Sequence, residues 1–294
     1  SDLSCKLDKV NRLPGFFAIP PQIQIASSKV YSQGKIHGID AASGAAVSAL
    51  DVSPGDHVLD LCAAPGAKLC MLSDILGDSG SLTGVDIAKS RLAACRTMLR
   101  KYALGDRCRL FVADGTSFSL LPYQEWSPRM PWKERRKIKQ SNELLYYGKH
   151  SGIVGLRKDQ LGYDKVLVDA ECTHDGSVRH IHKFERWGWD TLQHRLLDAQ
   201  RIGSLTQLQL QLLTNGFRLL KVGGSLVYST CSLTVAQNED IVEQFLLENP
   251  SAELQEIAAA KHWPCRSGRI PRTIRFDPLT SQTSGLFIAK ILKL

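Results

Sequence analysis

The stretch His57–Lys68, which reads H-V-L-D-L-C-A-A-P-G-A-K, limits the possible folds of this chain more than any other segment. Its first five residues form a short apolar run with one acid, which is typical of a buried parallel strand. The small residues at 63–66 then predict a tight turn. The stretch therefore predicts a strand, a turn and a helix, because apolar residues return at helical spacing at Leu69, Leu72, Ile75 and Leu76.

Such a turn brings a ligand against backbone N–H groups at a helix N-terminus, where the helix dipole favours a carboxylate or a phosphate. The segment contains neither G-x-G-x-x-G nor Gly-Lys-Ser/Thr, so the dinucleotide fingerprint and the P-loop are both excluded. On its own it is equally compatible with an ordinary strand-to-helix turn whose small residues allow close packing. The rest of the chain has to separate these two interpretations.

Apolar strand-like runs alternate with helical patterns over most of the 294 residues. This alternation predicts one α/β domain with a doubly wound parallel sheet, in which ligands bind at the carboxyl ends of the strands. The Gly223-Gly224 pair is expected to end the helix before the last parallel strand. The expected strands are 81–85, 109–113, 163–168 and 225–228, and the expected helices are 89–102, 204–220 and 238–247.

The pattern divides the chain into a lead-in at residues 1–50 and a domain at 51–294. In the lead-in, Asp40 or Ser43 can cap a helix that ends near Asp51. Residues 123–160 interrupt the alternation with nine basic and four acidic side chains, interleaved with tryptophan and tyrosine. This basic insertion suits phosphate contact and base stacking, although a solvated insertion without a ligand can have the same composition.

An aspartate stands at the expected carboxyl end of four strands. A single aspartate after a strand is usually a helix cap or a turn former. Four on one sheet edge, beside a small-residue turn, indicate a ligand site instead. A carboxylate after the second strand is placed for a ribose diol, and one after the third could accept a hydrogen bond from an adenine amino group. These residues are Asp60, Asp86, Asp114 and Asp169.

The eight cysteines are scattered, without a C-x-x-C pair or a zinc-like spacing to histidine. We therefore expect no metal site, and free thiols as in a reducing compartment. Cys172 and Cys231 follow two different strands, so both are expected at the ligand-binding edge. A thiol there can act as a nucleophile. His174 and His180 lie close to Cys172 in the sequence and are expected to be surface loop histidines.

The net charge of +8 and the pI of about 9.1 suit a polyanionic partner such as nucleic acid, although many basic proteins bind none. No run of 18 apolar residues is present, so no membrane-spanning segment is expected. The protein is expected to be a monomer. The nucleus or nucleolus, the cytoplasm and the mitochondrion all stay open as its compartment.

Five short motifs occur in a fixed order: C-A-A-P-G-A-K at 62–68, V-D-I at 85–87 with Arg91, A-D-G at 113–115, D-A-E-C-T at 169–173 and Y-S-T-C-S at 228–232. With these motifs the chain resembles the RNA cytosine-5 methyltransferases, the Sun/Nop group that includes RsmB-like enzymes. The similarity extends from about Pro14 to the C-terminus, where 285–290 resembles the closing strand of the family. It implies a Rossmann-like sheet that uses S-adenosyl-L-methionine to methylate C5 of cytosine in tRNA or rRNA.

The resemblance also implies a set of cofactor contacts. The turn at 62–68 would meet the methionine carboxylate. Asp86 would hold the ribose hydroxyls, Asp114 would meet the adenine, and Asp169 would face the methyl group and the target base. The implied cofactor-binding residues are Cys62, Ala63, Ala64, Pro65, Gly66, Ala67, Lys68, Asp86, Arg91, Asp114 and Asp169.

Catalytic roles for cysteine follow from the same resemblance, because cytosine C5 becomes a good nucleophile only after a thiolate adds at C6. Cys231 would be this nucleophile, and Cys172 would help to remove the C5 proton and release the product. Asp169 could share a proton at N3 of the base. Lys68 would either hydrogen-bond the base or be a surface lysine near the cofactor.

Two residues depart from the pattern of the family. Glu171 stands where proline is usual, and its negative charge is expected to raise the pKa of the Cys172 thiol. Ala67 stands where glycine is common, which is a mild change if φ there is negative. Two other interpretations stay open: an RNA-binding scaffold with this fold but little activity, and a methyltransferase that acts on protein or small molecules.

Overall fold

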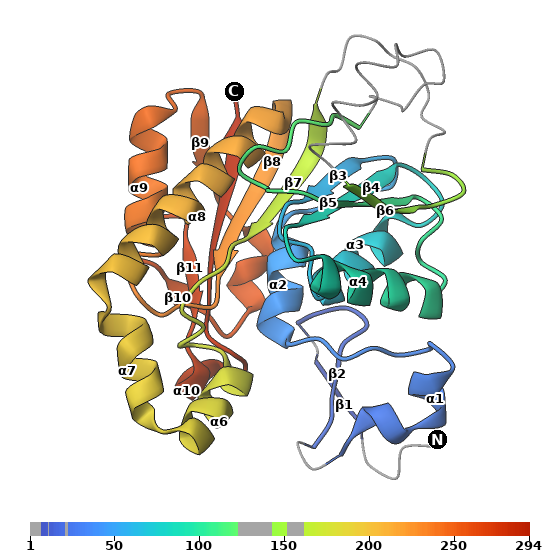
Figure 1. Ribbon diagram of the computed structural model, residues 1–294, viewed down its shortest axis with the longest axis horizontal. Coiled ribbons are helices and arrows are strands. Elements are labelled where there is room, and N and C mark those ends of the chain that lie inside the picture. The colour runs from blue at the N-terminus through green and yellow to red at the C-terminus, as the bar shows by residue number, and fades with distance from the viewer. Residues whose placement is uncertain (1–6, 11, 21–22, 123–142, 152–161) are drawn as a thin grey trace.

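The computed structural model describes residues 7–10, 12–20, 23–122, 143–151 and 162–294. Its centre is a parallel sheet with the strand order β8, β7, β3, β4 and β5 (Figure 1). Helices cover both faces of this sheet, so the predicted doubly wound architecture is confirmed. The parallel strands are β3 (His57–Asp60), β4 (Ser81–Asp86), β5 (Cys108–Val112), β7 (Tyr163–Asp169) and β8 (Leu220–Thr230).

Antiparallel strands extend the sheet at both edges. β12 (Leu286–Lys293) pairs with β8, in agreement with the expected closing strand. β6 (Glu143–Tyr147) pairs with β5, so part of the expected insertion is an edge strand. Positions 123–142 and 152–160 of that segment lie outside the described residues. The strands on the β12 side are β9 (Ala252–Gln255), β10 (Arg266–Ser267) and β11 (Ile274–Phe276).

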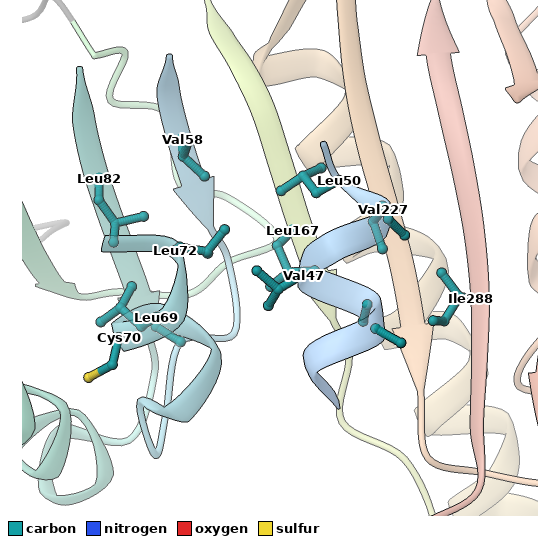
Figure 2. Packing of buried hydrophobic residues seen from close by; sticks show 14 of the residues in the cluster. Val47, Leu50, Val58, Leu69, Cys70, Leu72, Leu82, Leu167, Val227 and Ile288 are labelled. Atoms are coloured by element: carbon teal, nitrogen blue, oxygen red, sulfur yellow. The ribbon is translucent and has the colours of Figure 1, made fainter. Parts of the chain in front are cut away.

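Three helices cover one face of the sheet through fully buried aliphatic side chains. In Figure 2, Val47 of α2 lies beside Leu167 of β7, and Leu72 of α3 lies near Val58. Each of these side chains has 0% exposed surface, and such burial contributes about 1.5–3 kcal/mol per residue. The helices on this face are α2 (Ala41–Ala49), α3 (Ala67–Leu76) and α4 (Lys89–Lys101).

The opposite face is covered mainly by α8 (Ala199–Leu219) and α9 (Glu239–Glu248). The expectation that Gly223-Gly224 ends the long helix is wrong, because the backbone already becomes extended at Leu220. Both glycines lie inside β8, where the pairing with β7 shifts register. Between β7 and α8 the chain forms α6 (Val178–Trp187) and α7 (Trp189–Leu197).

The lead-in is joined to the core through a cap. Asp40 Oδ1 accepts a hydrogen bond from Ala42 N (2.9 Å), as expected for the residue that caps α2, and Oδ2 accepts from Ser284 N (3.1 Å) before β12. No helix in the described part of the chain is long and apolar enough to cross a bilayer. The shorter elements are β1 (Asp8–Lys9), β2 (Phe17–Ala18), η1 (Ile25–Ser27), α1 (Lys29–Ser32), η2 (Ala258–His262) and α10 (Pro278–Ser281).

Candidate active site

Two adjacent strands define the binding edge of the sheet. β3 and β7 lie side by side, but α3 follows β3 onto one face and α8 follows β7 onto the other. A ligand crevice forms at such a switch point, beyond the carboxyl ends of the strands. Asp60 ends β3 and Asp169 ends β7, so two of the four expected aspartates lie here.

The turn after β3 is held by hydrogen bonds to β4 and α4. Ala63 N donates to Val85 O (2.9 Å), and Ala64 N donates to Asp86 Oδ2 (3.1 Å). From α4, Arg91 Nη2 donates to Ala64 O (3.0 Å). Asp86 and Arg91 therefore lie at the expected cofactor turn, where they hold its backbone.

The turn delivers the chain directly into α3. Gly66 has a φ of +112°, a left-handed conformation that favours glycine, and a Cβ there would lie 3.0 Å from Cys95 Cα. Ala67 is the first residue of the helix, so its departure from glycine causes no backbone strain. Pro65 is exposed next to this helix N-terminus.

Asp114 follows β5 at the same edge and is exposed. Its Oδ1 accepts hydrogen bonds from Thr116 N (2.9 Å) and from Thr116 Oγ1 (2.8 Å). These contacts are those of a turn former. The exposure of Asp114 leaves its carboxylate accessible to a ligand, so the adenine contact stays a prediction.

Asp60 is buried, with 1% of its surface exposed, and its Oδ1 accepts a hydrogen bond from Cys62 N (3.2 Å). Burial and then the charge of Asp169 raise the pKa of Asp60 to about 7, and the charge of Asp86 acts in the same direction. The switch point therefore holds carboxylates that repel one another. A positively charged ligand would relieve this repulsion.

Asp60→Asn is expected to stabilise the ligand-free protein at pH 8. The folded-state pKa of about 7 lies above the reference value of 3.8, so folding favours the protonated acid and stability falls as the pH rises through this range. Asparagine keeps the oxygen that accepts from Cys62 without the charge. Urea unfolding should give a free energy of unfolding about 2–4 kcal/mol above wild type at pH 8, and nearly the wild-type value at pH 4. An equal difference at both pH values would contradict this account.

Lys68 lies inside the site and is not a surface lysine. Its Nζ is 2.6 Å from Asp169 Oδ2, and the two side chains are 15% and 27% exposed. Ser229 Oγ donates to the other oxygen of Asp169 (2.8 Å). Burial alone would lower the pKa of Lys68, but the charge and the hydrogen bond of Asp169 outweigh it and raise the pKa. The ammonium is therefore held in place as a permanent positive charge at the switch point.

The two cysteines meet at this edge although they are 59 positions apart in the sequence. Cys172 Sγ lies 3.4 Å from Cys231 Sγ. Cys172 is 1% exposed, whereas Cys231 is partly exposed. As expected, both follow strands of the binding edge, and Cys231 is the sulfur that a ligand reaches more easily.

The expectation that His174 and His180 are surface loop histidines is wrong. His174 Nδ1 lies 3.2 Å from Cys231 Sγ and 3.6 Å from Cys172 Sγ. The His174 and His180 rings stack with their centroids 4.5 Å apart and an interplanar angle of 11°. Sequence spacing did not predict the contact with Cys231, because that residue is 57 positions from His174 and follows another strand, β8.

The two thiols have opposite pKa shifts. The hydrogen bond from Cys231, opposed by burial and reinforced by the backbone N–H of His174 (3.4 Å), lowers the pKa of Cys172 to about 6. The same hydrogen bond, together with burial, raises the pKa of Cys231. At neutral pH the pair therefore shares one proton, and the backbone N–H that His174 donates to Cys172 Sγ favours the thiolate on Cys172. The expectation that Glu171 raises the pKa of Cys172 is wrong. The Glu171 side chain is exposed, and the contacts to the Cys172 sulfur determine the pKa of this thiol.

A buried polar network, which the sequence reasoning missed, joins the two cysteine loops. Gly176 N donates to Cys231 O (2.9 Å), and a Cβ at this glycine would lie 2.6 Å from that oxygen. Gln237 Oε1 accepts from Thr173 N (3.1 Å), and its Nε2 donates to Ser232 Oγ (3.1 Å). The signal in the sequence was the polar pair Gln237-Asn238 directly before α9. Both side chains are fully buried.

The donor atoms of Cys172, His174 and Cys231 all lie within 4.8 Å of one another, a spacing that a metal ion could use. The charges of Asp169 and Lys68, which both act on Cys231, are opposite in sign and offset each other there. The absence of a metal from this site stays a prediction.

A Rossmann-like sheet, a small-residue turn at its switch point and acidic residues at the strand ends define the fold of an S-adenosyl-L-methionine-dependent methyltransferase. The family described as 16S rRNA methyltransferase RsmB/F matches residues 47–126 and 149–292 of the chain. The chain belongs to this family, and the resemblance seen in the sequence is confirmed.

Named relatives agree with this assignment. The chain is 27% identical over 264 residues to ribosomal RNA small subunit methyltransferase B of Pseudomonas syringae pv. tomato, covering 90% of this chain and 48% of the relative. It is 25% identical over 289 residues to tRNA (cytosine(49)-C(5))-methyltransferase of Pyrococcus abyssi, covering 95% of this chain and 77% of the relative. The crystal structure of a methyltransferase homolog protein from Pyrococcus horikoshii has a TM-score of 0.69 at 27% identity. The match covers 98% of this chain and 78% of that one. The chain spans about half the length of the methyltransferase B relatives it matches.

Proposed function

We propose that this chain transfers a methyl group from S-adenosyl-L-methionine to C5 of a cytosine in tRNA or rRNA, through a covalent bond between Cys231 and C6 of the base. The observation that carries this proposal is the pair of cysteine sulfurs, 3.4 Å apart, at the switch point. A methyltransferase for protein or small-molecule nucleophiles does not need such a pair, because those nucleophiles attack the methyl group directly. The names of the relatives, an rRNA and a tRNA methyltransferase, support RNA as the substrate.

The charges at the turn fit this cofactor, which when bound supplies an electrophilic methyl group on a sulfonium. Its sulfonium and its ammonium are both positive, and the carboxylates of Asp60, Asp86 and Asp169 repel one another where they lie. The turn at 62–67, at the N-terminus of α3, would hold the methionine carboxylate. Asp86, at the end of β4, would hold the ribose.

The chain's own residues supply the remaining steps. Cys231 Sγ forms a bond to C6 of cytosine, and the electron pair of the C5–C6 double bond moves toward C5 and N3. Lys68, held by Asp169 at 2.6 Å, stabilises the negative charge that develops on the base. After C5 has been methylated, Cys172 takes the C5 proton, the double bond forms again and the C6–S bond breaks. The lowered pKa of Cys172, about 6, keeps this thiol deprotonated at neutral pH.

Incubation of the purified protein with radiolabelled S-adenosyl-L-methionine and with tRNA or rRNA from cells that lack the protein tests this function. We expect label in one of the two RNA classes, at a cytosine that bisulfite sequencing then identifies. RNA binding without any label would favour the scaffold interpretation. Unchanged turnover in Cys231→Ser would favour a protein or small-molecule substrate.

The basic insertion is predicted to bind the RNA backbone, although Arg135, Arg136 and Lys137 lie outside the described residues. Charge reversal at these three positions should weaken RNA affinity by about 10–100-fold near 50 mM salt and flatten its salt dependence, since fewer counterions are released. Fluorescence anisotropy between about 50 and 200 mM salt measures both effects. Charge reversal at the exposed Lys261 is the matched control. Unaltered affinity over this range would remove the insertion from the interface.

We also propose that the protein works in a reducing compartment. The seven cysteines in the described part of the chain are free thiols, and the proposed reaction uses two of them. The nucleus or nucleolus, the cytoplasm and the mitochondrion all meet this requirement. Fluorescence imaging of the full-length protein in cells separates these compartments.

A further inference from the structure

We propose that His174 is a catalytic base that takes the thiol proton of Cys231 as its sulfur adds to C6, which leaves Cys172 free to take the C5 proton later. This inference rests on the proposed cytosine methylation. It assigns a role to a residue that lies in none of the expected site positions.

The first support is distance. His174 Nδ1 lies 3.2 Å from Cys231 Sγ, within hydrogen-bonding range for sulfur, and 3.6 Å from Cys172 Sγ. The same imidazole nitrogen therefore reaches both reacting thiols. The backbone N–H of His174 also donates to Cys172 Sγ (3.4 Å), so this one residue contacts Cys172 from two sides.

The second support is the backbone. His174 has a φ of +60°, a left-handed conformation that is unfavourable for a residue with a Cβ and that concentrates at functional sites. The loop is held in this conformation by Ser177 N, which donates to His174 O (3.2 Å), and by Gly176 N, which donates to Cys231 O (2.9 Å). Stacking on His180 fixes the ring, and His180 is anchored in turn by Ser177 Oγ at 3.0 Å. The strained loop thus places the imidazole beside the sulfurs.

The third support is proton balance. Two protons leave at different times: the Cys231 S–H proton when sulfur adds, and the C5 proton when the product is released. If Cys172 took the first proton, it would be protonated when the second must leave. As the first base, His174 is neutral and carries its hydrogen on Nε2, so the lone pair of Nδ1 points at the sulfurs. The S–H bond of Cys231 then breaks, its proton moves to Nδ1 (3.2 Å away), and the sulfur electron pair forms the S–C6 bond.

The cycle then closes without a further reactant. Cys172 takes the C5 proton, the C–H electron pair forms the C5–C6 double bond again, and the S–C6 pair returns to Cys231. The imidazolium of His174 returns its proton to that sulfur. The proton on Cys172 passes to solvent and is the net proton of the reaction.

The test compares the wild type with His174→Asn and His174→Gly in the full chain. Both replacements tolerate a positive φ, so neither should disturb the loop. The exposed His182 of α6, which pairs with Glu185, gives the control variant His182→Asn. The rate of covalent capture of RNA containing 5-azacytidine is measured from pH 5 to 10 under single-turnover conditions. The titratable groups in contact with His174 are Cys172, His180 and Cys231. The charges of Lys68 and Asp169 act on Cys231 and also shape this profile.

We expect capture at pH 7 to be about 10²-fold slower in His174→Asn, and the rate to increase steadily with pH where the wild type is level. Added imidazole should restore much of the rate in His174→Gly. A wild-type rate in His174→Asn, or a slower rate with an unchanged pH profile and no rescue, would overturn the role of His174 as a base. If the wild type captures no RNA and transfers no methyl group, the proposed function itself fails, which is a different result.

Discussion

Replacing Cys231 with alanine is expected to abolish covalent capture of RNA that contains 5-azacytidine, and to lower methyl transfer by at least about 10³-fold. Without a sulfur bonded to C6, C5 of cytosine keeps its aromatic electron distribution and cannot attack the methyl group. Cys172 is a poor substitute because it is 1% exposed, whereas Cys231 is partly exposed at the binding edge. Denaturing gel electrophoresis of the RNA–protein adduct and radiolabelled methyl transfer measure the two effects.

Cys265→Ala is the matched control for this experiment. Its thiol lies away from the switch point, with Ala260 O as its hydrogen-bond partner (3.6 Å). This variant should capture RNA and transfer methyl groups as the wild type does. An adduct that forms equally well in Cys231→Ala would assign the nucleophile to another group and remove the basis of the proposed mechanism.

Replacing Cys172 with alanine is expected to give the opposite phenotype, in which the enzyme bonds to ordinary RNA and fails to release it. Cys231 can still add to C6 and C5 can still be methylated, but no base is left to take the C5 proton. Turnover should fall by about 10²–10⁴-fold while an adduct with unmodified RNA accumulates on denaturing gels. The adduct should be absent from the double variant that also carries Cys231→Ala.

The pKa of Cys172 adds a measurable pH dependence. Because this pKa is lowered to about 6, the thiol is deprotonated at neutral pH and becomes protonated as the pH falls through that value. Product release in the wild type should therefore slow below about pH 6, and the adduct should become detectable there. Prompt release from Cys172→Ala, or release that does not change between pH 5 and 7, would assign this proton transfer to another residue.

The strands were predictable because their signal is local. The run His57–Leu61 is short and mostly apolar, as expected for a strand covered on both faces, and 81–85 is a short run that an aspartate and a helical pattern follow. The boundary between α8 and β8 was not predictable from Gly223-Gly224, because both glycines lie inside β8, where its pairing with β7 shifts register. Likewise, nothing local marks Glu143–Tyr147 as an edge strand on β5.

The sequence by itself determined the family, the order of the parallel strands along the chain and the two cysteines that follow their ends. Only the tertiary structure decided how those cysteines interact. The register of β7 against β8 sets Asp169 opposite Ser229, and this pairing brings the sulfurs of Cys172 and Cys231 to 3.4 Å. A pKa depends on such contacts across space, so the position of the thiolate and the place of His174 beside it could not be predicted from neighbours in the sequence.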